Sequence, residues 1–235
     1  MPTLERVMTH DFDKDYWQDH WSGREAERGQ GGETSGPHPF LEEQLAGLEP
    51  GTALEAGCGE GAEALWLAAR GWQVTAVDIA ADVLRRAADH ASRSTVGERV
   101  AWVEADLSTW EPGRRFDLVT SHYAHASIPQ LDLYDRLASW VAPGGTLLLV
   151  GHLHTAGSEA DHRDSHHDSH HDSHRDSHRD GHPPEHATVT ADDVSARLDP
   201  DAWRLVTSHE GARTVRDGTG RPVTLHDVVI TATRR

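Results

Sequence analysis

Cysteine and long apolar runs are both scarce in this chain of 235 residues. Its single cysteine, Cys58, excludes an intrachain disulfide, which fits a reducing cytoplasm. No uninterrupted apolar run reaches the roughly 18 residues of a membrane-spanning helix, and the first residues do not have the pattern of a signal peptide. We therefore expect a cytoplasmic protein without a membrane partner.

Positive charge is scarce as well, because 39 acidic residues oppose 22 basic ones and the formal net charge is −17. Binding to nucleic acid or to an anionic membrane needs a positive field at the phosphate groups. No cluster of lysine and arginine supplies such a field, so we expect no nucleic-acid partner. Hydrophobic residues make up 36% of the chain and concentrate in short runs, which is enough for one three-layer core. A monomer and a homodimer both stay open.

The most informative stretch is a short apolar run at residues 53–56 that leads into a glycine-rich turn. The run predicts a buried strand, and residues 60–70 have the apolar spacing of a helix. Between them stand Gly57, Gly59 and Gly61, which permit a positive φ and the close approach of a ligand to the backbone. Such a turn holds a nucleotide-like ligand at the carboxyl end of a parallel sheet.

The spacing of the three glycines separates two kinds of nucleotide-like cofactor. A dinucleotide fingerprint has the pattern G-x-G-x-x-G, whereas the third glycine comes one residue early here. Glu55 stands just before the first glycine, where its carboxylate would repel a pyrophosphate and attract an ammonium group. A nicotinamide-dependent oxidoreductase is therefore disfavoured. A glycine-rich turn without any ligand is the simplest alternative.

The sequence Leu-Glu-Ala-Gly-Cys-Gly-Glu-Gly at residues 54–61 resembles the first motif of class I S-adenosylmethionine-dependent methyltransferases. The resemblance implies an α/β, three-layer, Rossmann-like class I methyltransferase fold, with a seven-stranded, mostly parallel sheet and an antiparallel last strand. It also implies that S-adenosyl-L-methionine is the cofactor. The strands that we expect after the first one are residues 73–78, 100–106, 116–121, 146–151, 201–210 and 223–232.

Acidic residues at two strand ends complete the expected cofactor site. Asp78 ends the second strand, where a carboxylate accepts hydrogen bonds from a ribose diol. In the family that the chain resembles, the acid after the third strand, here Asp106, contacts the adenine amino group, and the next backbone N–H reaches a ring nitrogen. The resemblance assigns the methionine end of the cofactor to Glu55 and the glycine turn. The expected cofactor residues are Glu55, Gly57, Cys58, Gly59, Gly61, Asp78, Ile79, Asp106, Leu107, Ser121, Trp17 and Trp21.

Residues 1–39 form a polar N-terminal arm with three neighbouring aromatic residues, Tyr16, Trp17 and Trp21. Trp17 and Trp21 are four residues apart, so a helical turn would place both rings on one face. One interpretation is that the rings anchor the arm to the core. The other is a lid whose rings flank the cofactor and the substrate, and the arm's resemblance to those of thiopurine-type small-molecule methyltransferases favours it.

Histidines at the end of the fourth expected strand are the candidates for catalysis. This strand delivers His122 and His125 to the carboxyl edge of the sheet, where α/β enzymes place their sites. A histidine can accept a proton from a thiol or a phenol near neutral pH, and a protonated nucleophile needs such a base. The alternative is that both histidines bond the loop backbone or line the pocket wall. His152 and His154, after the fifth strand, are further candidates for the pocket rim.

An abrupt change of composition begins at Asp161, where the tetrapeptide Asp-Ser-His-x repeats up to His182. No apolar residue lies in this stretch, so it cannot bury a core, and we expect residues 156–185 to be a disordered insertion. Imidazoles bind divalent zinc, nickel, cobalt or copper, so one of these metals is a possible second cofactor. The candidate metal ligands are His166, His170, His174 and His178. The alternatives are a tolerated repeat without a metal function and a response to pH below about 6.5.

The expected organisation has three parts, namely the arm at residues 1–39, a methyltransferase domain at 40–155 and 186–235, and the insertion at 156–185. The resemblance, which extends to tellurite-resistance and thiopurine-type enzymes, implies methyl transfer to a small-molecule acceptor with a thiol, hydroxyl or metalloid nucleophile. A second hypothesis is a metal-sequestration protein that carries the insertion on a degenerate methyltransferase domain. No motif specifies the acceptor, because variable loops select it.

Overall fold

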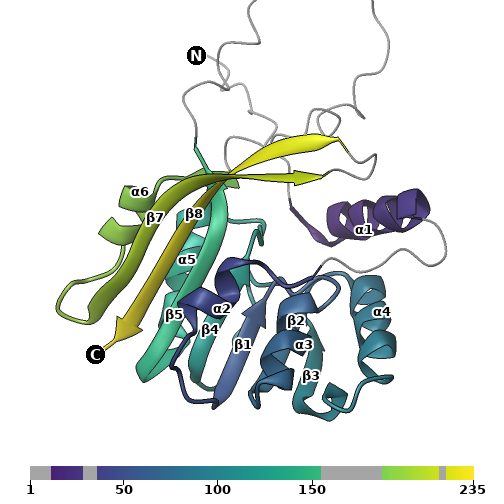
Figure 1. Ribbon diagram of the computed structural model, residues 1–235, viewed down its shortest axis with the longest axis horizontal. Coiled ribbons are helices and arrows are strands. Elements are labelled where there is room, and N and C mark those ends of the chain that lie inside the picture. Colours follow the sequence, from purple (N-terminus) through teal and green to yellow (C-terminus); the bar gives the residue numbers. More distant parts are fainter. Residues whose placement is uncertain (1–11, 29–35, 155–186, 217–220) are drawn as a thin grey trace, which may run out of the picture.

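The computed structural model describes residues 12–28, 36–154, 187–216 and 221–235, which form an eight-stranded mixed sheet with helices on both faces (Figure 1). The strands are β1 (Thr52–Ala56), β2 (Gln73–Asp78), β3 (Val100–Glu104), β4 (Phe116–His122), β5 (Val141–Leu153), β6 (Thr188–Val189), β7 (Trp203–Arg216) and β8 (Pro222–Arg234). The helices are α1 (Lys14–Arg28), α2 (Phe40–Gln44), α3 (Ala62–Ala69), α4 (Ala81–Ala91), α5 (Gln130–Ser139) and α6 (Ala191–Ala196), and a 3-10 turn spans Gly97–Arg99.

The strand order across the sheet is β3-β2-β1-β4-β5-β8-β7, and the two-residue β6 pairs with the end of β5. The pairs from β3 to β5 are parallel, whereas β8 is antiparallel to both β5 and β7. This confirms the predicted mostly parallel sheet with an antiparallel last strand. The seven expected strands form the main path. The sequence does not reveal β6, because two residues are too few to show a period.

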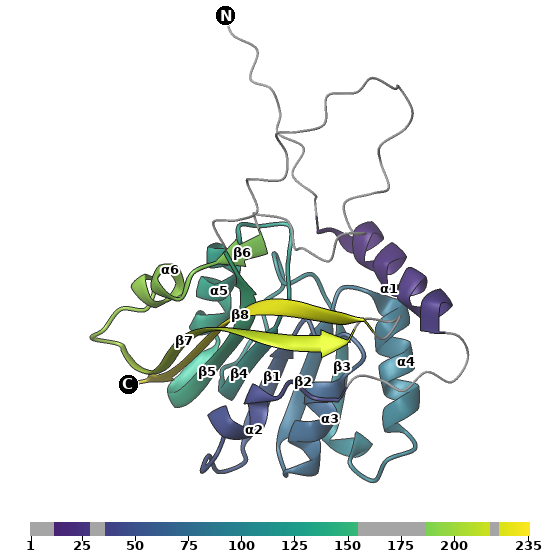
Figure 2. The same cartoon turned by 45° about the horizontal axis from the view of Figure 1, so that its top comes forward.

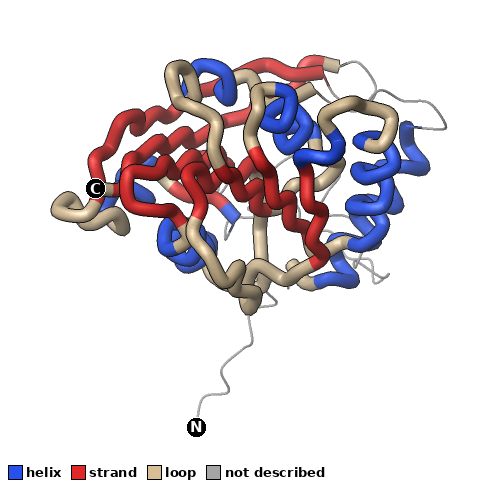
Figure 3. The backbone as a smooth tube through the Cα atoms, turned by 90° about the horizontal axis from the view of Figure 1, so that it is seen from below, coloured by secondary structure: helices blue, strands red, loops and turns tan. Residues whose placement is uncertain are grey.

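Alternate side chains of the central strands feed two separate cores, one on each face of the sheet. Leu147 and Leu149 of β5 belong to the core that includes α5 and α6, whereas Leu148 belongs to the core that includes α2, α3 and α4. All three leucines are at most 2% exposed. A strand covered on both faces is expected to read as a continuous apolar run. Seen from below, the strands accordingly run between helices on either side (Figure 3).

The helix α6 begins with a side-chain cap. Thr190 is the N-cap: its Oγ1 accepts a hydrogen bond from the Asp193 N–H at 3.1 Å, and Asp193 Oδ2 accepts one from the Thr190 N–H at 3.3 Å. This reciprocal pair is a capping box. The residues just before the cap do not join the helix, because Thr188 and Val189 pair with β5 instead.

The strand β7 extends six residues beyond its expected end at residue 210, whereas β8 lies within two residues of its expected bounds. Their antiparallel pairing runs from Trp203 opposite Arg234 to Arg216 opposite Pro222. The added part is polar and lacks a continuous apolar run, so only the backbone pairing of the hairpin reveals it. This part of the hairpin projects past the carboxyl edge of the sheet and crosses above it towards the side of α1 (Figures 1 and 2). Among the described residues, no helix has the length and apolar character of a membrane span.

Burial on β8 leads to a prediction for stability. Ile230 is fully buried between β5 and β7, whereas Val206 of β7 is 53% exposed at a break in the strand register. We expect Ile230→Ala to lower the free energy of unfolding by about 2–5 kcal/mol, because the cavity that it leaves cannot fully collapse. Val206→Ala is the matched control and should cost about 1 kcal/mol or less. Denaturant unfolding of both variants measures the difference, and equal losses would contradict the assigned core.

Candidate functional site

A cavity of about 780 Å³ lies at the carboxyl ends of the parallel strands. Residues that end or follow β1, β2, β3 and β4 contribute to its lining, and α1 and the extended hairpin supply further side chains. The chain passes from β1 to β2 on one side of the cavity, and β4 lies on the other side, so the strand order reverses here. Open α/β sheets bind their ligands at such a point, in pockets of about 300–1,000 Å³.

Most of the residues expected from the sequence meet at this cavity. Those that line it are Trp17, Trp21, Gly57, Cys58, Gly59, Asp78, Ile79, Asp106, Leu107, His122 and His125. Glu55, Gly61 and Ser121 are not part of the lining. Glu55 and Ser121 are buried behind it, and the Ser121 hydroxyl donates to the Ala56 carbonyl at 3.0 Å. Gly61 is instead the left-handed N-cap of α3.

The glycine turn is held in place from β2. The N–H groups of Gly57 and Cys58 both donate to the Val77 carbonyl, at 2.8 and 2.9 Å, and the Gly59 N–H donates to Asp78 Oδ2 at 2.9 Å. Gly57 has a φ of +73°, and a Cβ at this position would lie 2.3 Å from the Cβ of Ala124. Only glycine therefore lets the turn pass so close to the end of β4.

Two carboxylates face the cavity beside this turn. Asp78 accepts N–H groups from Gly59 and Ala80, one on each oxygen, and burial raises the pKa of its carboxyl although these donors oppose the rise. Each oxygen has a second lone pair that these bonds do not use. Asp106 Oδ1 accepts the N–H and the hydroxyl of Ser108 at 2.8 and 2.6 Å. The two acids have fixed positions at neighbouring strand ends.

The aromatic residues of α1 cover one side of the cavity. Trp21 lies over the glycine turn, because a Cβ at Gly59 would be 2.9 Å from its ring. One turn earlier, Trp17 is nearly parallel to His125, with 6.4 Å between ring centroids, and Phe12 stacks on the same histidine at 5.0 Å. The predicted shared face of Trp17 and Trp21 therefore points to both the turn and the end of β4.

His122 forms a buried pair with Glu55. Its Nδ1 lies 3.1 Å from Glu55 Oε1, and both side chains are at most 5% exposed. Burial raises the pKa of Glu55 and lowers the pKa of His122, which favours the neutral form of each group. In a neutral pair whose carboxylic acid donates from Oε1 to Nδ1, the imidazole hydrogen is on Nε2. Within the described part of the chain, His122 Nε2 and Glu55 Oε2 are buried without a hydrogen-bond partner.

His125 carries its proton on the opposite nitrogen. Gln130 donates from its side-chain nitrogen to the Ala124 carbonyl at 3.0 Å, which orients the amide, and its Oε1 lies 2.7 Å from His125 Nδ1. An amide oxygen can only accept, so Nδ1 of His125 must carry the hydrogen. The lone pair of the neutral ring is therefore on Nε2. The two histidines thus differ, with His122 a donor and His125 an acceptor at Nε2.

A further polar cluster surrounds Tyr123. The hydroxyl of Tyr123 donates to Asp227 Oδ1 at 2.7 Å and accepts from Arg213 Nη2 at 2.9 Å and from His38 Nε2 at 3.1 Å. Burial lowers the pKa of His38 to about 3 and that of His152, which also lines the cavity, to about 4. Both histidines are therefore neutral at physiological pH. His154 is not in the lining and bonds Thr188 instead.

Comparison with known proteins identifies the central part of the chain. Residues 53–145 match a family model described as a methyltransferase domain. This part of the chain is therefore similar to methyltransferase domains. A relative described as an uncharacterized methyltransferase of Mycobacterium bovis is 42% identical over 99 residues, which cover 41% of this chain and 48% of the relative. The chain thus matches about half the length of this curated relative.

Solved structures share the fold over most of the chain. TehB from Haemophilus influenzae superposes with a TM-score of 0.64 at 14% identity, over 93% of this chain and 67% of that one. NodS, an N-methyltransferase from Bradyrhizobium japonicum in complex with S-adenosyl-L-homocysteine, has a TM-score of 0.61 at 16% identity, over 92% and 97% of the two chains. At these identities the likeness shows the fold, which is the predicted class I methyltransferase fold.

Sequence patterns did not reveal the Tyr123 cluster. Arg213 and Asp227 are 90 and 104 residues away from Tyr123, and no local spacing joins them. One signal was present, because Asp227 is an acid within the otherwise apolar and β-branched run of β8. A charged residue in a buried strand needs a partner, and this could have marked the position. Tyr123 itself has a φ of 55°, which the sequence does not show.

The candidate metal ligands His166, His170, His174 and His178 lie outside the described residues, as does the expected insertion at 156–185. Within residues 12–28, 36–154, 187–216 and 221–235, no group of three or more His, Cys, Asp and Glu side chains is arranged to hold a metal ion. The described residues therefore add no metal site to the one predicted in the histidine repeat.

Gly57 and Gly144 allow the close approach at the turn to be tested. Both have a positive φ, of +73° and +79°, but no atom lies within 4 Å of a Cβ at Gly144. We expect Gly144→Ala to cost about 1–2 kcal/mol in the free energy of unfolding, from backbone strain alone. Gly57→Ala should cost at least about 1 kcal/mol more, because Ala124 must move. Denaturant unfolding compares them, and equal costs would argue against the close contact.

Proposed function

We propose that this protein transfers the methyl group of S-adenosyl-L-methionine to a small-molecule nucleophile. The observation that carries the proposal is the glycine turn, which is bonded to Asp78 at the strand-order reversal of a methyltransferase domain. When bound, the cofactor supplies a methyl group activated by a sulfonium. The acceptor gains that methyl group and gives up a proton, and S-adenosyl-L-homocysteine is left.

The residues around the turn suit the three parts of this cofactor. Asp78 would accept the ribose hydroxyls with the lone pairs that its N–H donors leave. Asp106 would accept from the adenine amino group, with Leu107 beside it in the cavity wall. The methionine end would lie against the backbone of the glycine turn and under Trp21. The buried N–H at His122 Nε2 would gain an acceptor from a ligand, which supports the fit of a polar group there.

The two histidine candidates have different roles in this proposal. His125 is the general base, because the lone pair of its neutral ring is on Nε2 and Gln130 holds Nδ1. His122 cannot serve in the same way, because Glu55 occupies its Nδ1 and the other nitrogen is protonated. It would instead orient the bound molecules as a donor, and Glu55 would act through it.

A base favours particular acceptors. A thiol or a hydroxyl must lose a proton as the methyl group arrives, so a histidine accelerates that transfer. A metalloid that attacks with a lone pair has no proton to lose. The aromatic rings of Phe12 and Trp17 beside His125 supply an apolar wall for a small organic molecule. We therefore favour a thiol or hydroxyl acceptor over a metalloid.

Calorimetric titration with S-adenosyl-L-homocysteine tests the cofactor. We expect one-to-one binding in the micromolar range, and Asp78→Asn should weaken it about tenfold or more through the loss of a charged hydrogen-bond acceptor. Asp82→Asn, an exposed acid on α4, is the matched control and should leave the affinity unchanged. Unchanged affinity in Asp78→Asn would remove Asp78 from the site. An absence of binding by the folded wild-type protein would overturn the proposed function.

The role of Gln130 can be tested without knowing the acceptor. We expect Gln130→Glu to raise the pKa of His125 above its wild-type value, because a carboxylate at Nδ1 stabilises the imidazolium. An NMR titration of the histidine ring signals measures the shift. Gln73→Glu makes the same change at an exposed position on β2 and should leave this pKa unchanged. A pKa of His125 that does not respond to Gln130→Glu would show that Gln130 does not hold this ring.

A further inference from the structure

The charges around the cavity are divided between its two sides. Its acidic lining residues, Glu60, Glu63, Asp78 and Asp106, belong to the half of the sheet that contains β1, β2 and β3. Among the described lining residues, Arg213 is the only lysine or arginine, and it comes from β7 at the other edge of the sheet. A molecule that reaches from the glycine turn towards the hairpin therefore passes from a negative to a positive environment.

Arg213 is held so that part of its guanidinium is available to a ligand. Its Nε donates to Asp227 Oδ2 at 2.6 Å, and its Nη2 donates to the Tyr123 hydroxyl at 2.9 Å. No residue in the described part of the chain bonds its Nη1, and the side chain is 24% exposed. Two hydrogens on Nη1 and the second hydrogen on Nη2 are thus not used within the described residues.

The acidic partner of Arg213 lies away from the cavity. The Asp227 side chain is 2% exposed and is absent from the lining, and its two oxygens are occupied by Arg213 and by the Tyr123 hydroxyl. A ligand in the cavity therefore meets the cation first, and the acid supports it from behind. A guanidinium in the cavity wall with an acid behind it suits the binding of an anion, because the guanidinium is oriented before the ligand arrives.

The backbone of this cluster is strained at Tyr123. Tyr123 is the one non-glycine residue with a positive φ among the described residues, at 55°, and an isolated strain of this kind concentrates at functional sites. Its hydroxyl uses one hydrogen and two lone pairs on Asp227, Arg213 and His38, so it is fully bonded. Tyr123 and Asp227 therefore hold the guanidinium directly, and His38 fixes the Tyr123 hydroxyl.

We propose that Arg213 binds a carboxylate of the methyl acceptor, so that the substrate is a small carboxylic acid that also bears the methylated thiol or hydroxyl. The inference deepens the proposed function and rests on it. A carboxylate is the favoured partner because two donors of a guanidinium match its two oxygens in one plane. In a chain with a net charge of −17, an acidic small molecule needs such a local cation to enter the cavity.

Matched pairs of probes test the charge of the acceptor. We would titrate the protein, saturated with S-adenosyl-L-homocysteine, with benzoate and benzamide and with 3-mercaptopropionate and 3-mercaptopropionamide. Each pair has nearly the same shape and differs in charge. We expect each carboxylate to bind about tenfold tighter than its amide, the difference expected for a hydrogen-bonded ion pair. Equal binding within both pairs, or no saturable binding of either carboxylate, would overturn the proposal.

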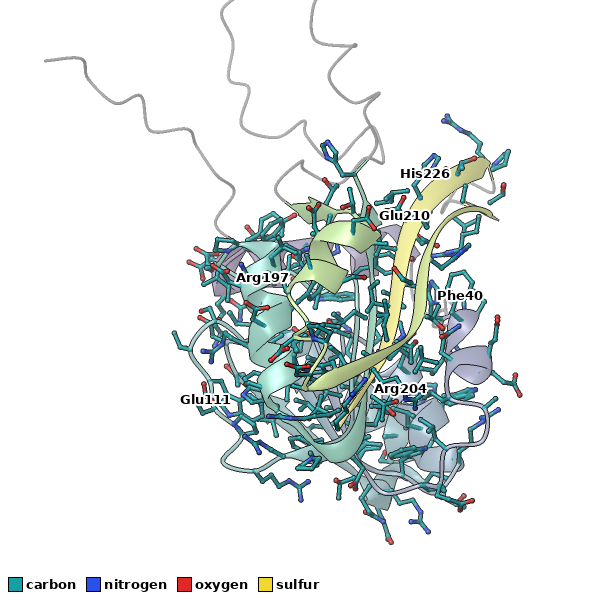
Figure 4. The ribbon with its side chains drawn as sticks, turned by 90° about the vertical axis from the view of Figure 1, so that its left-hand side faces the viewer. Phe40, Glu111, Arg197, Arg204, Glu210 and His226 are labelled. Atoms are coloured by element: carbon teal, nitrogen blue, oxygen red, sulfur yellow. The ribbon has the colours of Figure 1, made fainter. Side chains whose placement is uncertain are left out.

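Two arginine variants test whether Arg213 causes the preference for carboxylates. Arg213→Gln should abolish the preference for carboxylates, whereas Arg204→Gln should retain it. Arg204 lies on the same strand but outside the cavity, where it bonds Thr233, and it sits well away from the hairpin tip that carries His226 (Figure 4). A preference that persists in Arg213→Gln would overturn the proposal. Circular dichroism checks that Arg213→Gln folds. If it does not fold, the ratio of carboxylate to amide affinity in the wild-type protein still tests the proposal.

The failure of this inference can be told apart from a failure of the proposed function. Binding of S-adenosyl-L-homocysteine depends on the side of the cavity that contains Asp78, and the carboxylate preference depends on the side that contains Arg213. If S-adenosyl-L-homocysteine binds but carboxylates are not preferred, the acceptor is not a carboxylic acid and the methyltransferase proposal stands. If S-adenosyl-L-homocysteine does not bind, the proposed function fails, and the acceptor assignment that rests on it fails too.

Discussion

The site depends on the contact between the glycine turn after β1 and the strands on either side of it. Two N–H groups of the turn share the Val77 carbonyl, and a third N–H, from Gly59, reaches Asp78. On the other side, the turn passes so close to Ala124 that no side chain fits at Gly57. These constraints together determine where the ends of β2 and β4 lie relative to each other. The carboxylate and the histidines that face the cavity follow from that placement.

Burial and hydrogen bonding then give two nearby histidines opposite properties. The same type of side chain is a donor at Nε2 where a neutral carboxylic acid donates to Nδ1, the arrangement that burial of Glu55 favours at His122. It is an acceptor at Nε2 where the Gln130 amide holds Nδ1, as at His125. The partner at Nδ1 decides the role of Nε2 in each case, because a neutral imidazole carries a hydrogen on only one of its two nitrogens. Across the sheet, Arg213 places a cation in the cavity wall, and Asp227 bonds it from behind the lining.

Local patterns predicted the elements whose residues are close together in the chain. β2 has the expected bounds, and the apolar runs of β1, β4 and β5 are strands of the expected sheet. The fold that follows from their order was therefore predicted correctly. The last six residues of β7 and the two-residue β6 were missed, because backbone pairing with another strand forms them and no hydrophobic period marks them. The histidine repeat lies outside the described residues, so its role stays a prediction.

The sequence alone determined the class of fold and the edge of the sheet at which the glycine turn and the acidic strand ends meet. Both depend on short-range features, namely the apolar period, the glycine spacing and the acids at strand ends. Each of these features can be recognised from residues that are neighbours in the chain. Only the tertiary structure decided which atoms face one another. It places Glu55 behind His122, Gln130 beside His125, and Arg213 with Tyr123 and Asp227. These contacts join residues from 5 to 104 positions apart, and their protonation depends on burial, which no local pattern of the chain contains.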